Sequence, residues 1–202
     1  MKTIVWDIDD VLNDLTRSWF DSVWKRENPE MEMQYEQLTL NPPHELLGMS
    51  REAYQCSLDR FRLSSEATEM KPDSSVLNWF NKWGAEYRHI ALTARPIKTV
   101  SPAVSWLMDN FGEWFEGFGF VPSRRLDEHP KQPDKKKRDF LAWLGKANYF
   151  IDDHVENIEG SDELGIRSFI AAQPWNGGNM TVIEILETIN RENAKNLPVN
   201  EK

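Results

Sequence analysis

The chain has 202 residues, of which 40% are hydrophobic and 28% are charged, and its formal net charge is -9. This length suits one domain, or one domain with a small insertion, and is too short for two full domains. The acidic balance argues against a surface that wraps duplex nucleic acid, and no apolar run is long enough to cross a membrane. The N-terminus lacks the basic region and apolar block of a signal peptide, so we expect a cytoplasmic protein.

The cysteine content limits the kind of metal site that is possible. Cys56 is the only cysteine, and one thiol forms neither an internal disulfide framework nor a cysteine zinc site. Any bound metal must therefore be held mainly by oxygen atoms, which suits Mg²⁺. A small phosphorylated ligand is compatible with the negative net charge, because charges more than about 10 Å away are largely screened at moderate salt.

Short apolar runs alternate with helical patterns along the chain. The apolar runs are TIVWD, RHIALT, FGFVP, NYFID and IRSFIA. Near-continuous runs of this kind fit a parallel sheet that is buried on both faces. The segments between them with helical spacing are SVLNWFNKWG, SPAVSWLMDNFG, DKKKRDFLAWLG and VENIEGSDELG. This order predicts an α/β fold with a Rossmann-like parallel sheet sandwiched by helices.

Capping residues predict where two of these helices begin. In SPAV, Ser101 is a favourable N-cap and Pro102 takes the first helical position. In PDKKKRDFL, Asp134 is the predicted N-cap, which places Lys135–Arg138 in the first turn. Cations there meet the positive end of the helix dipole, at a cost of about 0.3 to 1 kcal/mol each, unless an anion is bound. The alternative is a solvated basic face.

One segment interrupts the alternation of strands and helices. No strand is predicted between residues 14 and 71, where helical patterns such as LTRSWFDSVWKR and REAYQCSLDRFR are separated by TLNPPHELLG. We interpret residues 14–71 as a small helical insertion into an α/β core formed by residues 1–13 and 72–190. The polar segment 191–202 is expected to be a flexible tail. The aromatic residues of the insertion should mostly fill its own core: Trp19, Phe20, Trp24, Tyr35, Tyr54 and Phe61.

Polar residues stand at the ends of three predicted strands. The first strand ends at Asp7 in IVWDIDDVLND, the second at Thr93 in LTARP, and the fourth at Asp152 and Asp153 in IDDHVENI. Ligands of open α/β sheets bind outside the carboxyl ends of the strands, so we expect these side chains to meet at one edge. Each motif alone has a structural alternative, as a turn or N-cap residue, or for Thr93 as a capping hydroxyl before Pro96. Their occurrence together in this order favours a functional site.

The ordered motifs resemble those of the haloacid dehalogenase (HAD) superfamily. The matching residues are DIDDV, the threonine of LTARP, a lysine at the start of KKKRDFL, and IDD. The resemblance spans the α/β core, and it implies a HAD-like core with a small helical cap of the C1 type at residues 14–71. DDHVENIE followed by AAQPWN is also similar to the 5'(3')-deoxyribonucleotidase-like group. This chain has Asp10 where many members of the superfamily have glycine.

The resemblance implies a phosphatase that uses a carboxylate nucleophile. Asp7 would attack phosphorus and form an aspartyl-phosphate, and Asp9 would serve as general acid and base. Mg²⁺ would be bound by Asp7, the backbone carbonyl of Asp9, Asp152 and waters. Asp153 would bind the ion directly or hydrogen-bond to one of its ligands.

The resemblance also assigns the groups that hold the phosphate. Thr93 and the backbone N–H of Ala94 would bind phosphate oxygens, and a lysine of the triplet would balance charge in the transition state. We choose Lys137, because KRDFL is similar to the lysine that precedes a helix in this superfamily. Lys136 is the alternative.

The substrate expected from the resemblance is a nucleoside or deoxynucleoside monophosphate. One alternative is a HAD phosphatase for sugar phosphates or for the 3'-phosphate ends of nucleic acids, although the acidic balance disfavours long nucleic acids. Another is a noncatalytic module that binds phosphate or Mg²⁺, which the presence of both Asp7 and Asp9 disfavours. Oligomeric state has no signal in the sequence.

Overall fold

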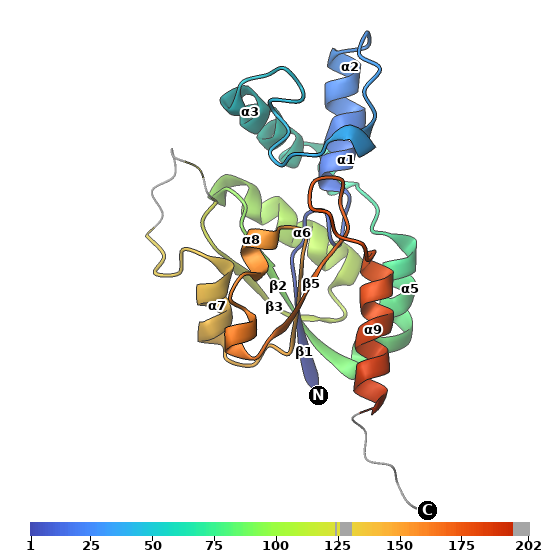
Figure 1. Cartoon of the computed structure of the whole chain (residues 1–202), viewed down its shortest axis with the longest axis vertical. Coiled ribbons are helices and arrows are strands. Elements are labelled where there is room, and N and C mark those ends of the chain that lie inside the picture. Colours follow the sequence, from blue (N-terminus) through green and yellow to red (C-terminus); the bar gives the residue numbers. More distant parts are fainter. Residues whose placement is uncertain (124, 126–130, 196–202) are drawn as a thin grey trace, which may run out of the picture.

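The five predicted strands form one parallel sheet in the order β3-β2-β1-β4-β5 (Figure 1). The computed structural model describes residues 1–123, 125 and 131–195. The strands are β1 Lys2–Trp6, β2 Tyr87–Thr93, β3 Phe115–Phe120, β4 Tyr149–Asp152 and β5 Arg167–Ile170. The helices beside them are α5 Ser74–Trp83, α6 Val100–Phe111, α7 Lys137–Leu144, α8 Val155–Ile158 and α9 Val182–Lys195. The predicted α/β fold is thereby confirmed.

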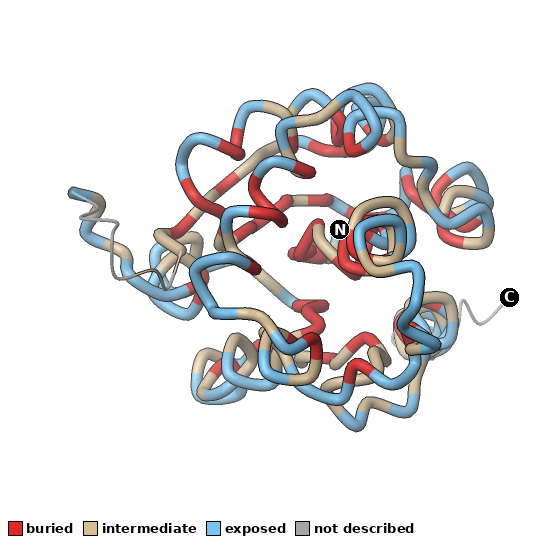
Figure 2. Tube along the Cα trace, turned by 90° about the horizontal axis from the view of Figure 1, so that it is seen from above, coloured by how far each residue is buried: buried red, intermediate tan, exposed pale blue. Residues whose placement is uncertain are grey.

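Alternate residues of the central strand face opposite sides of the sheet. Ile4 and Trp6 belong to one hydrophobic cluster and Val5 to another, and all three are fully buried. Successive side chains of a strand point to opposite faces, so an unbroken apolar run fits a strand that is covered on both sides. Seen from above, buried positions gather along the central strands and on the inner sides of the surrounding helices (Figure 2).

Helices cover both faces of the sheet (Figure 1). On one face, α5, α6 and α9 contribute Phe80, Leu107 and Ile185 to a shared cluster. On the other face, α7 and α8 contribute Leu141 and Ile158. This three-layer arrangement leaves the carboxyl ends of the strands free of the covering helices, at the edge where such sheets bind their ligands.

Helix α6 begins earlier than its capping pattern predicts. Its first residue is Val100, with Thr99 at the N-cap. A 3-10 turn leads directly into it, in which the Thr99 N–H donates to the Pro96 carbonyl at 2.8 Å. The prediction of Ser101 as N-cap is therefore wrong. Pro102 lies within the first turn, where its missing N–H has no helical partner to lose.

Helix α7 begins later than predicted. Its first residue is Lys137, with Lys136 at the N-cap position. The Asp139 carboxylate accepts hydrogen bonds from the backbone N–H groups of Lys135 and Lys136, both at 3.0 Å. A carboxylate inside the first turn thus satisfies donors at the helix start. The prediction of Asp134 as N-cap is therefore wrong.

Two glycines set the position and length of α7. Gly119 of β3 lies against the Phe140 ring, and a Cβ at this position would collide with that ring. A glycine in a strand allows this kind of close approach. The helix ends at Gly145, whose φ of +64° lies in the left-handed region that favours glycine.

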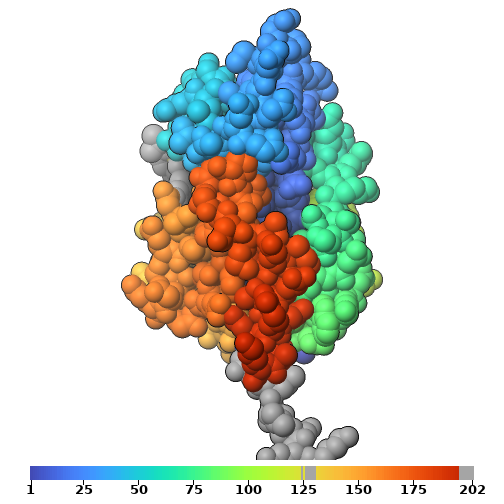
Figure 3. Space-filling view, turned by 45° about the vertical axis from the view of Figure 1, so that its right-hand side comes forward, coloured from blue at the N-terminus to red at the C-terminus, as the bar shows by residue number. Residues whose placement is uncertain are grey.

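Residues 15–68 form a layer above the carboxyl edge of the sheet (Figures 1 and 3). Its helices are α1 Leu15–Trp19, α2 Lys25–Glu27, α3 Arg51–Arg62 and α4 Ser65–Thr68, with a π-helical turn at Phe20–Trp24. The aromatic residues predicted to fill this segment share one hydrophobic cluster. Trp175, from the loop after β5, packs against the same cluster. The layer therefore has its own core and a contact with the sheet domain.

The C-terminal helix extends further than the sequence pattern indicates. α9 continues to Lys195, so residues 191–195 of the expected tail are helical, and buried Ile185, Leu186 and Ile189 hold the helix to the core. Residues 196–202 lie outside the described residues. The domain boundaries near residues 13, 71 and 190 stay predictions. Among the described helices, none has both the length and the apolar character needed to span a membrane.

A histidine is buried in the core between β2 and its neighbours. His89 is fully buried. Its Nδ1 accepts the indole N–H of Trp6 at 3.0 Å, and its Nε2 lies 2.9 Å from the Gly84 carbonyl, to which it donates. One acceptor and one donor nitrogen correspond to the neutral ring. Burial lowers the pKa of His89 to about 4, although the Gly84 carbonyl opposes this shift.

We predict that acid destabilises the fold partly through His89. Its pKa is about 4 in the folded protein and 6.5 ordinarily. Its contribution to the free energy of unfolding is therefore complete above about pH 6.5 and is lost as the pH falls towards about 4. The free energy of unfolding of the wild type should fall between about pH 7 and pH 4. In His89→Gln this fall should be smaller by up to about 3 kcal/mol. Urea unfolding measures both losses. Equal losses in the wild type and in His89→Gln would contradict the prediction.

Candidate active site

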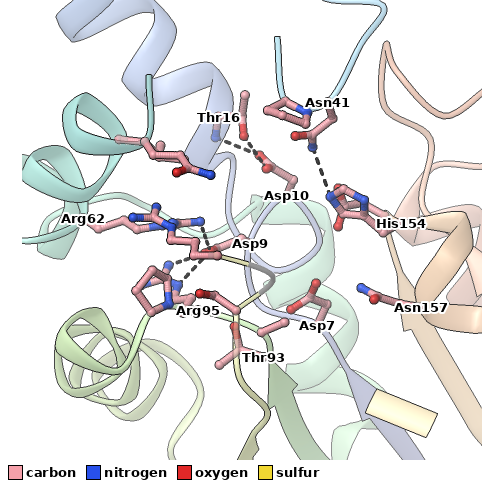
Figure 4. Close-up of a pocket in the computed structure, with 18 of the residues that line it drawn as sticks. Asp7, Asp9, Asp10, Thr16, Asn41, Arg62, Thr93, Arg95, His154 and Asn157 are labelled. Carbon is pink, nitrogen blue, oxygen red and sulfur yellow. Dashed lines mark hydrogen bonds and ion pairs between the residues drawn. The ribbon is translucent and has the colours of Figure 1, made fainter. Parts of the chain in front are cut away.

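Three neighbouring strands bring the predicted site residues together. Asp7 follows β1, and its backbone N–H extends the ladder by donating to the Ile151 carbonyl at 2.9 Å. Thr93 is the last residue of β2 and Asp152 the last of β4. Because β1 lies between β2 and β4, these residues meet at the centre of the sheet edge. Figure 4 shows Asp7 and Thr93 together in a pocket at this edge.

Three buried carboxylates cluster at this edge. One oxygen from each of Asp7, Asp152 and Asp153 lies within 4.8 Å of the other two. The three residues are buried, with relative exposures of 6%, 0% and 3%. Oxygen ligands at this spacing suit Mg²⁺. The side chain of Asp9 is not part of this cluster.

Lys137 lies between two of these carboxylates. Its Nζ is 2.7 Å from Asp7 Oδ2 and 2.7 Å from Asp152 Oδ2, and its side chain is fully buried. Burial on its own would lower the pKa of Lys137, but the two carboxylates outweigh burial and raise it. Lys135 and Lys136 are exposed. The anion that offsets the cation at this helix start is therefore supplied by the protein's own carboxylates.

The crowding of the carboxylates shifts their pKa values. Burial raises the pKa of Asp7 to about 7, against the opposing effect of Lys137, and Asp152 and Asp9 add to the rise. Burial and the neighbouring carboxylates raise the pKa of Asp153 well above its usual value. A divalent cation among the three oxygens would remove this repulsion. The donor atoms, their burial and their pKa shifts therefore fit a metal ion such as Mg²⁺.

Neutral donors orient two of the carboxylates. Asp152 Oδ1 accepts from the backbone N–H of His154 at 2.8 Å and from Asn157 Nδ2 at 2.9 Å. Asp153 Oδ2 accepts from the Trp175 indole N–H at 3.1 Å. The N-cap of α8 is His154, so the structural alternative that made Asp153 an N-cap is wrong. Asn157 lies in DDHVENIE and Trp175 in AAQPWN, but sequence reasoning assigned neither side chain a role, because no local pattern shows which group it contacts.

Asp9 points away from Asp7 and pairs with two arginines (Figure 4). It accepts from Arg95 Nε at 2.7 Å and also pairs with Arg95 Nη2, while Arg62 Nη2 lies 3.3 Å from Asp9 Oδ2. Burial would raise the pKa of Asp9, but Arg95 and Arg62 outweigh burial and hold the pKa below its usual value. Asp9 is therefore ionised in this arrangement.

The two arginines differ in how visible they are from the sequence. Arg95 follows Thr93 closely in LTARP, and this proximity could have marked it as a site residue. Arg62 is the last residue of α3, in the inserted layer, and nothing in its local pattern distinguishes it from neighbouring exposed Arg60.

Asp10 has a backbone conformation that favours glycine. Its φ is +59°, in the left-handed region where an ordinary side chain costs about 1 kcal/mol or more. The Asp10 carboxylate accepts from the Thr16 backbone N–H at 2.8 Å and from the Thr16 hydroxyl at 2.6 Å. These hydrogen bonds offset the cost of the strained conformation. They also tie the loop after β1 to the start of α1.

A cavity of about 320 Å³ lies between the sheet edge and the inserted layer. Core and insertion both contribute to its lining, with Asp7, Thr93, Ala94 and Arg95 from the core and Asn41, Tyr54 and Arg62 from the insertion. This volume lies near the lower end of the range of small-molecule sites, roughly 300 to 1,000 Å³. The cavity therefore has the size for a small ligand above Asp7.

A buried aspartate orders the basic wall of the cavity. Asp59, on α3, accepts from Arg125 Nη2 at 2.7 Å and lies 3.4 Å from Arg62 Nη1. The Lys98 ammonium lies 3.1 Å from its other oxygen. Two carboxylates, Asp9 and Asp59, thus face four cations, Arg62, Arg95, Arg125 and Lys98. This side of the cavity therefore keeps an excess of positive charge opposite the acidic cluster.

The solved structures that this chain resembles share one fold. A haloacid dehalogenase-like family protein, SP0104 from Streptococcus pneumoniae, superposes with a TM-score of 0.60 at 15% identity, covering 95% of this chain and 98% of that chain. A haloacid dehalogenase-like family hydrolase from Xanthomonas campestris gives a TM-score of 0.55 at 12% identity, covering 96% and 93%. The fold is that of the HAD-like hydrolases.

A third structure with the HAD-like fold was determined with a metal. YfnB from Bacillus subtilis, described as a HAD hydrolase and bound to magnesium, superposes with a TM-score of 0.59 at 12% identity, covering 94% of this chain and 98% of that chain. No protein-family model matches the chain, and no curated protein matches it. The predicted HAD-like core is confirmed as a fold.

We predict that Lys137 is required for stability, whereas its neighbours in the lysine triplet are not. Lys137→Met leaves two buried carboxylates without their cation, which should lower the free energy of unfolding by about 3 to 5 kcal/mol. Lys136→Met, at an exposed position, should change it by about 0.5 kcal/mol or less. Urea unfolding in EDTA measures both. Similar effects of the two substitutions would show that Lys137 is not the buried partner.

Proposed function

We propose that this chain is a Mg²⁺-dependent phosphomonoesterase that works through an aspartyl-phosphate on Asp7. The observation that carries the proposal is the meeting of Asp7, Asp152 and Asp153 with Lys137 beside a cavity of ligand size. The HAD-like fold of the solved hydrolases supports the same reaction class. The ordered motifs named above provide the residue roles.

The proposed reaction has two displacements at phosphorus. The Asp7 carboxylate attacks in line, and the bond between phosphorus and the leaving oxygen breaks as the acyl-phosphate forms. Asp9 gives its proton to the leaving alkoxide and then takes a proton from the water that attacks the phosphorus of the aspartyl-phosphate. Phosphate leaves, and the Asp7 carboxylate is regenerated. Asp9 is ionised while it is paired with Arg95 in this structure, so to act as the acid it must first be released and take up a proton from solvent.

The proposed metal site is formed by the buried carboxylates. Asp7, Asp152 and Asp153 would hold Mg²⁺, together with the backbone carbonyl of Asp9. When bound, the ion would offset the repulsion between the carboxylates and an incoming phosphate dianion. Lys137 would balance charge between Asp7 and Asp152, where its ammonium already lies.

The phosphate would be held on the β2 side of the cavity. Thr93 is buried and lines the cavity with Ala94. Within residues 1–123, 125 and 131–195, no hydrogen bond uses the Thr93 hydroxyl. This hydroxyl and the Ala94 backbone N–H are the proposed ligands of the phosphate oxygens. We further infer that residues 14–71 act as a cap of the C1 type that shapes the substrate pocket.

The proposed substrate is a nucleoside or deoxynucleoside monophosphate. The similarity of DDHVENIE and AAQPWN to the deoxyribonucleotidase-like group supports it. The cavity is also lined by the amides of Asn41 and Gln55 and by the rings of Tyr54 and His154. Flat rings and amides are groups that can stack on a base and hydrogen-bond to its edge. Sugar phosphates and 3'-phosphate ends are the alternatives.

We predict that Asp7→Asn abolishes hydrolysis of an aryl phosphate such as p-nitrophenyl phosphate. An amide is a poor nucleophile, so the release of p-nitrophenol should fall to the uncatalysed rate. The far-UV circular dichroism spectrum should stay unchanged, because the fold is kept. Asp14→Asn is the matched control, because Asp14 belongs to the same run of acids but is exposed. It should keep the wild-type rate. Activity retained in Asp7→Asn would remove the nucleophile assignment.

Metal removal separates an enzyme from a noncatalytic binding module. We predict that EDTA abolishes phosphate release and that excess Mg²⁺ restores it, because the crowded carboxylates need a cation to accept a phosphate dianion.

Phosphate release should be measured over nucleoside monophosphates, sugar phosphates and a 3'-phosphorylated oligonucleotide. The highest kcat/KM is expected for a nucleoside monophosphate. Preference for either other class would replace the substrate proposal, and no release from any would exclude the phosphatase.

A further inference from the structure

The loop after β5 contacts both the acidic cluster and the loop after β1. The Trp175 indole N–H donates to Asp153 Oδ2 at 3.1 Å, and Asn176 Nδ2 donates to the Asp153 carbonyl at 2.7 Å. Gln173 Nε2 donates to the Asp10 carbonyl at 2.8 Å. The side chains of one short segment thus reach the two loops from which the proposed metal ligands come.

Asn176 fixes the shape of the loop, because both its amide oxygen and its amide nitrogen form two hydrogen bonds. Asn176 Oδ1 accepts from the backbone N–H groups of Gln173 at 3.1 Å and of Gly178 at 2.8 Å. Its Nδ2 also donates to the Ala171 carbonyl at 2.7 Å. These hydrogen bonds fix the backbone on both sides of Trp175, so the direction of its indole is set before any ligand arrives.

The inserted layer holds the other side of the indole. The Tyr35 ring meets Trp175 edge to face, with 6.1 Å between the ring centroids and 80° between the planes. The Tyr35 hydroxyl donates to Gln173 Oε1 at 2.9 Å. Because Tyr35 belongs to the hydrophobic cluster of the layer, the position of Trp175 depends on the seating of that layer on the core.

The indole is the one side-chain donor to the Asp153 carboxylate among the described residues. His154 Nε2 lies 3.7 Å from the same oxygen, which is beyond hydrogen-bond distance. An indole N–H is neutral and is only a donor, so it orients the carboxylate without neutralising it and cannot itself bind the metal. Hydrogen bonds of this kind to a ligand carboxylate tune its affinity for metal.

We propose that Trp175 is a positioning residue that orients the Asp153 carboxylate for a divalent cation. The inference rests on the metal site of the proposed function and adds to it a residue of AAQPWN to which the sequence analysis assigned no role. Tyr35 holds the indole, so the metal affinity of the core depends on a contact from the inserted layer.

The test measures Mg²⁺ binding directly rather than turnover. Isothermal titration of MgCl₂ into the chelator-treated full chain compares the wild type with Trp175→Phe, which keeps an aromatic ring against Tyr35 and removes the N–H. The dissociation constant should rise about tenfold or more, as for other groups that orient metal ligands. The melting temperature in EDTA should stay close to that of the wild type.

A matched control is available on α7. Trp143 is 73% exposed, and Trp143→Phe removes the same N–H at a site remote from the loop. It should leave Mg²⁺ affinity unchanged. In an Asp153→Asn background, Trp175→Phe should raise the Mg²⁺ dissociation constant by much less than tenfold. The effects of two substitutions are not additive when the two residues act as a unit.

Several results would overturn the proposal. One is an unchanged Mg²⁺ affinity in Trp175→Phe. Another is a loss of Mg²⁺ affinity on Trp175→Phe that is as large in the Asp153→Asn background as in the wild type. The third is a melting temperature in EDTA lowered enough to show that the indole serves only the fold. Failure of the proposed function gives a different result. If the wild type binds Mg²⁺ and Trp175→Phe binds it more weakly, but no substrate releases phosphate, the positioning role stands and the phosphatase proposal does not.

Discussion

The ion pairs of Lys137 with Asp7 and Asp152 join three elements that are distant in the sequence. A buried ammonium and two buried carboxylates are each costly alone and are stable only together. Their 2.7 Å contacts therefore place the first turn of α7 against the ends of β1 and β4. Asp153, the next residue after Asp152, is brought into the same cluster. The chemistry proposed for the site depends on this one arrangement of charges.

Two residues of the inserted layer, Arg62 and Tyr35, contact groups beside the acidic cluster. Arg62 reaches Asp9 from α3, and Tyr35 contacts Trp175 and Gln173 in the loop after β5. Both contacts end on residues that neighbour the acidic cluster. The cavity therefore lies between the hydrophobic core of the sheet domain and that of the inserted layer. The way these two parts pack against each other determines the position of the charged and hydrogen-bonding groups. A movement of the layer would change the partners of Asp9 and the support of Asp153 together.

Sequence reasoning predicted the strands better than the helix starts. A short apolar run such as Ile4–Trp6 that is bounded by turn residues is a strong signal, because its length fits a strand buried on both faces better than a helix. Capping residues are weaker signals, because several side chains near a helix start can satisfy the same donors. Asp139 does so for α7 and a preceding 3-10 turn replaces Ser101 for α6. α9 extends to Lys195, although its buried residues Ile185, Leu186 and Ile189 all precede the polar segment.

The sequence by itself determined the sheet and the edge of the sheet at which Asp7, Thr93 and Asp152 gather. These follow from chain order, because parallel strands deliver their last residues to one edge. Only the tertiary structure decided that Lys137 is the buried lysine, that Asp9 pairs with Arg95 and Arg62, and that Trp175 donates to Asp153. The physical reason is that hydrogen bonds and ion pairs depend on distances of about 3 Å. Such distances between segments far apart in the chain are set by packing, which local patterns do not encode.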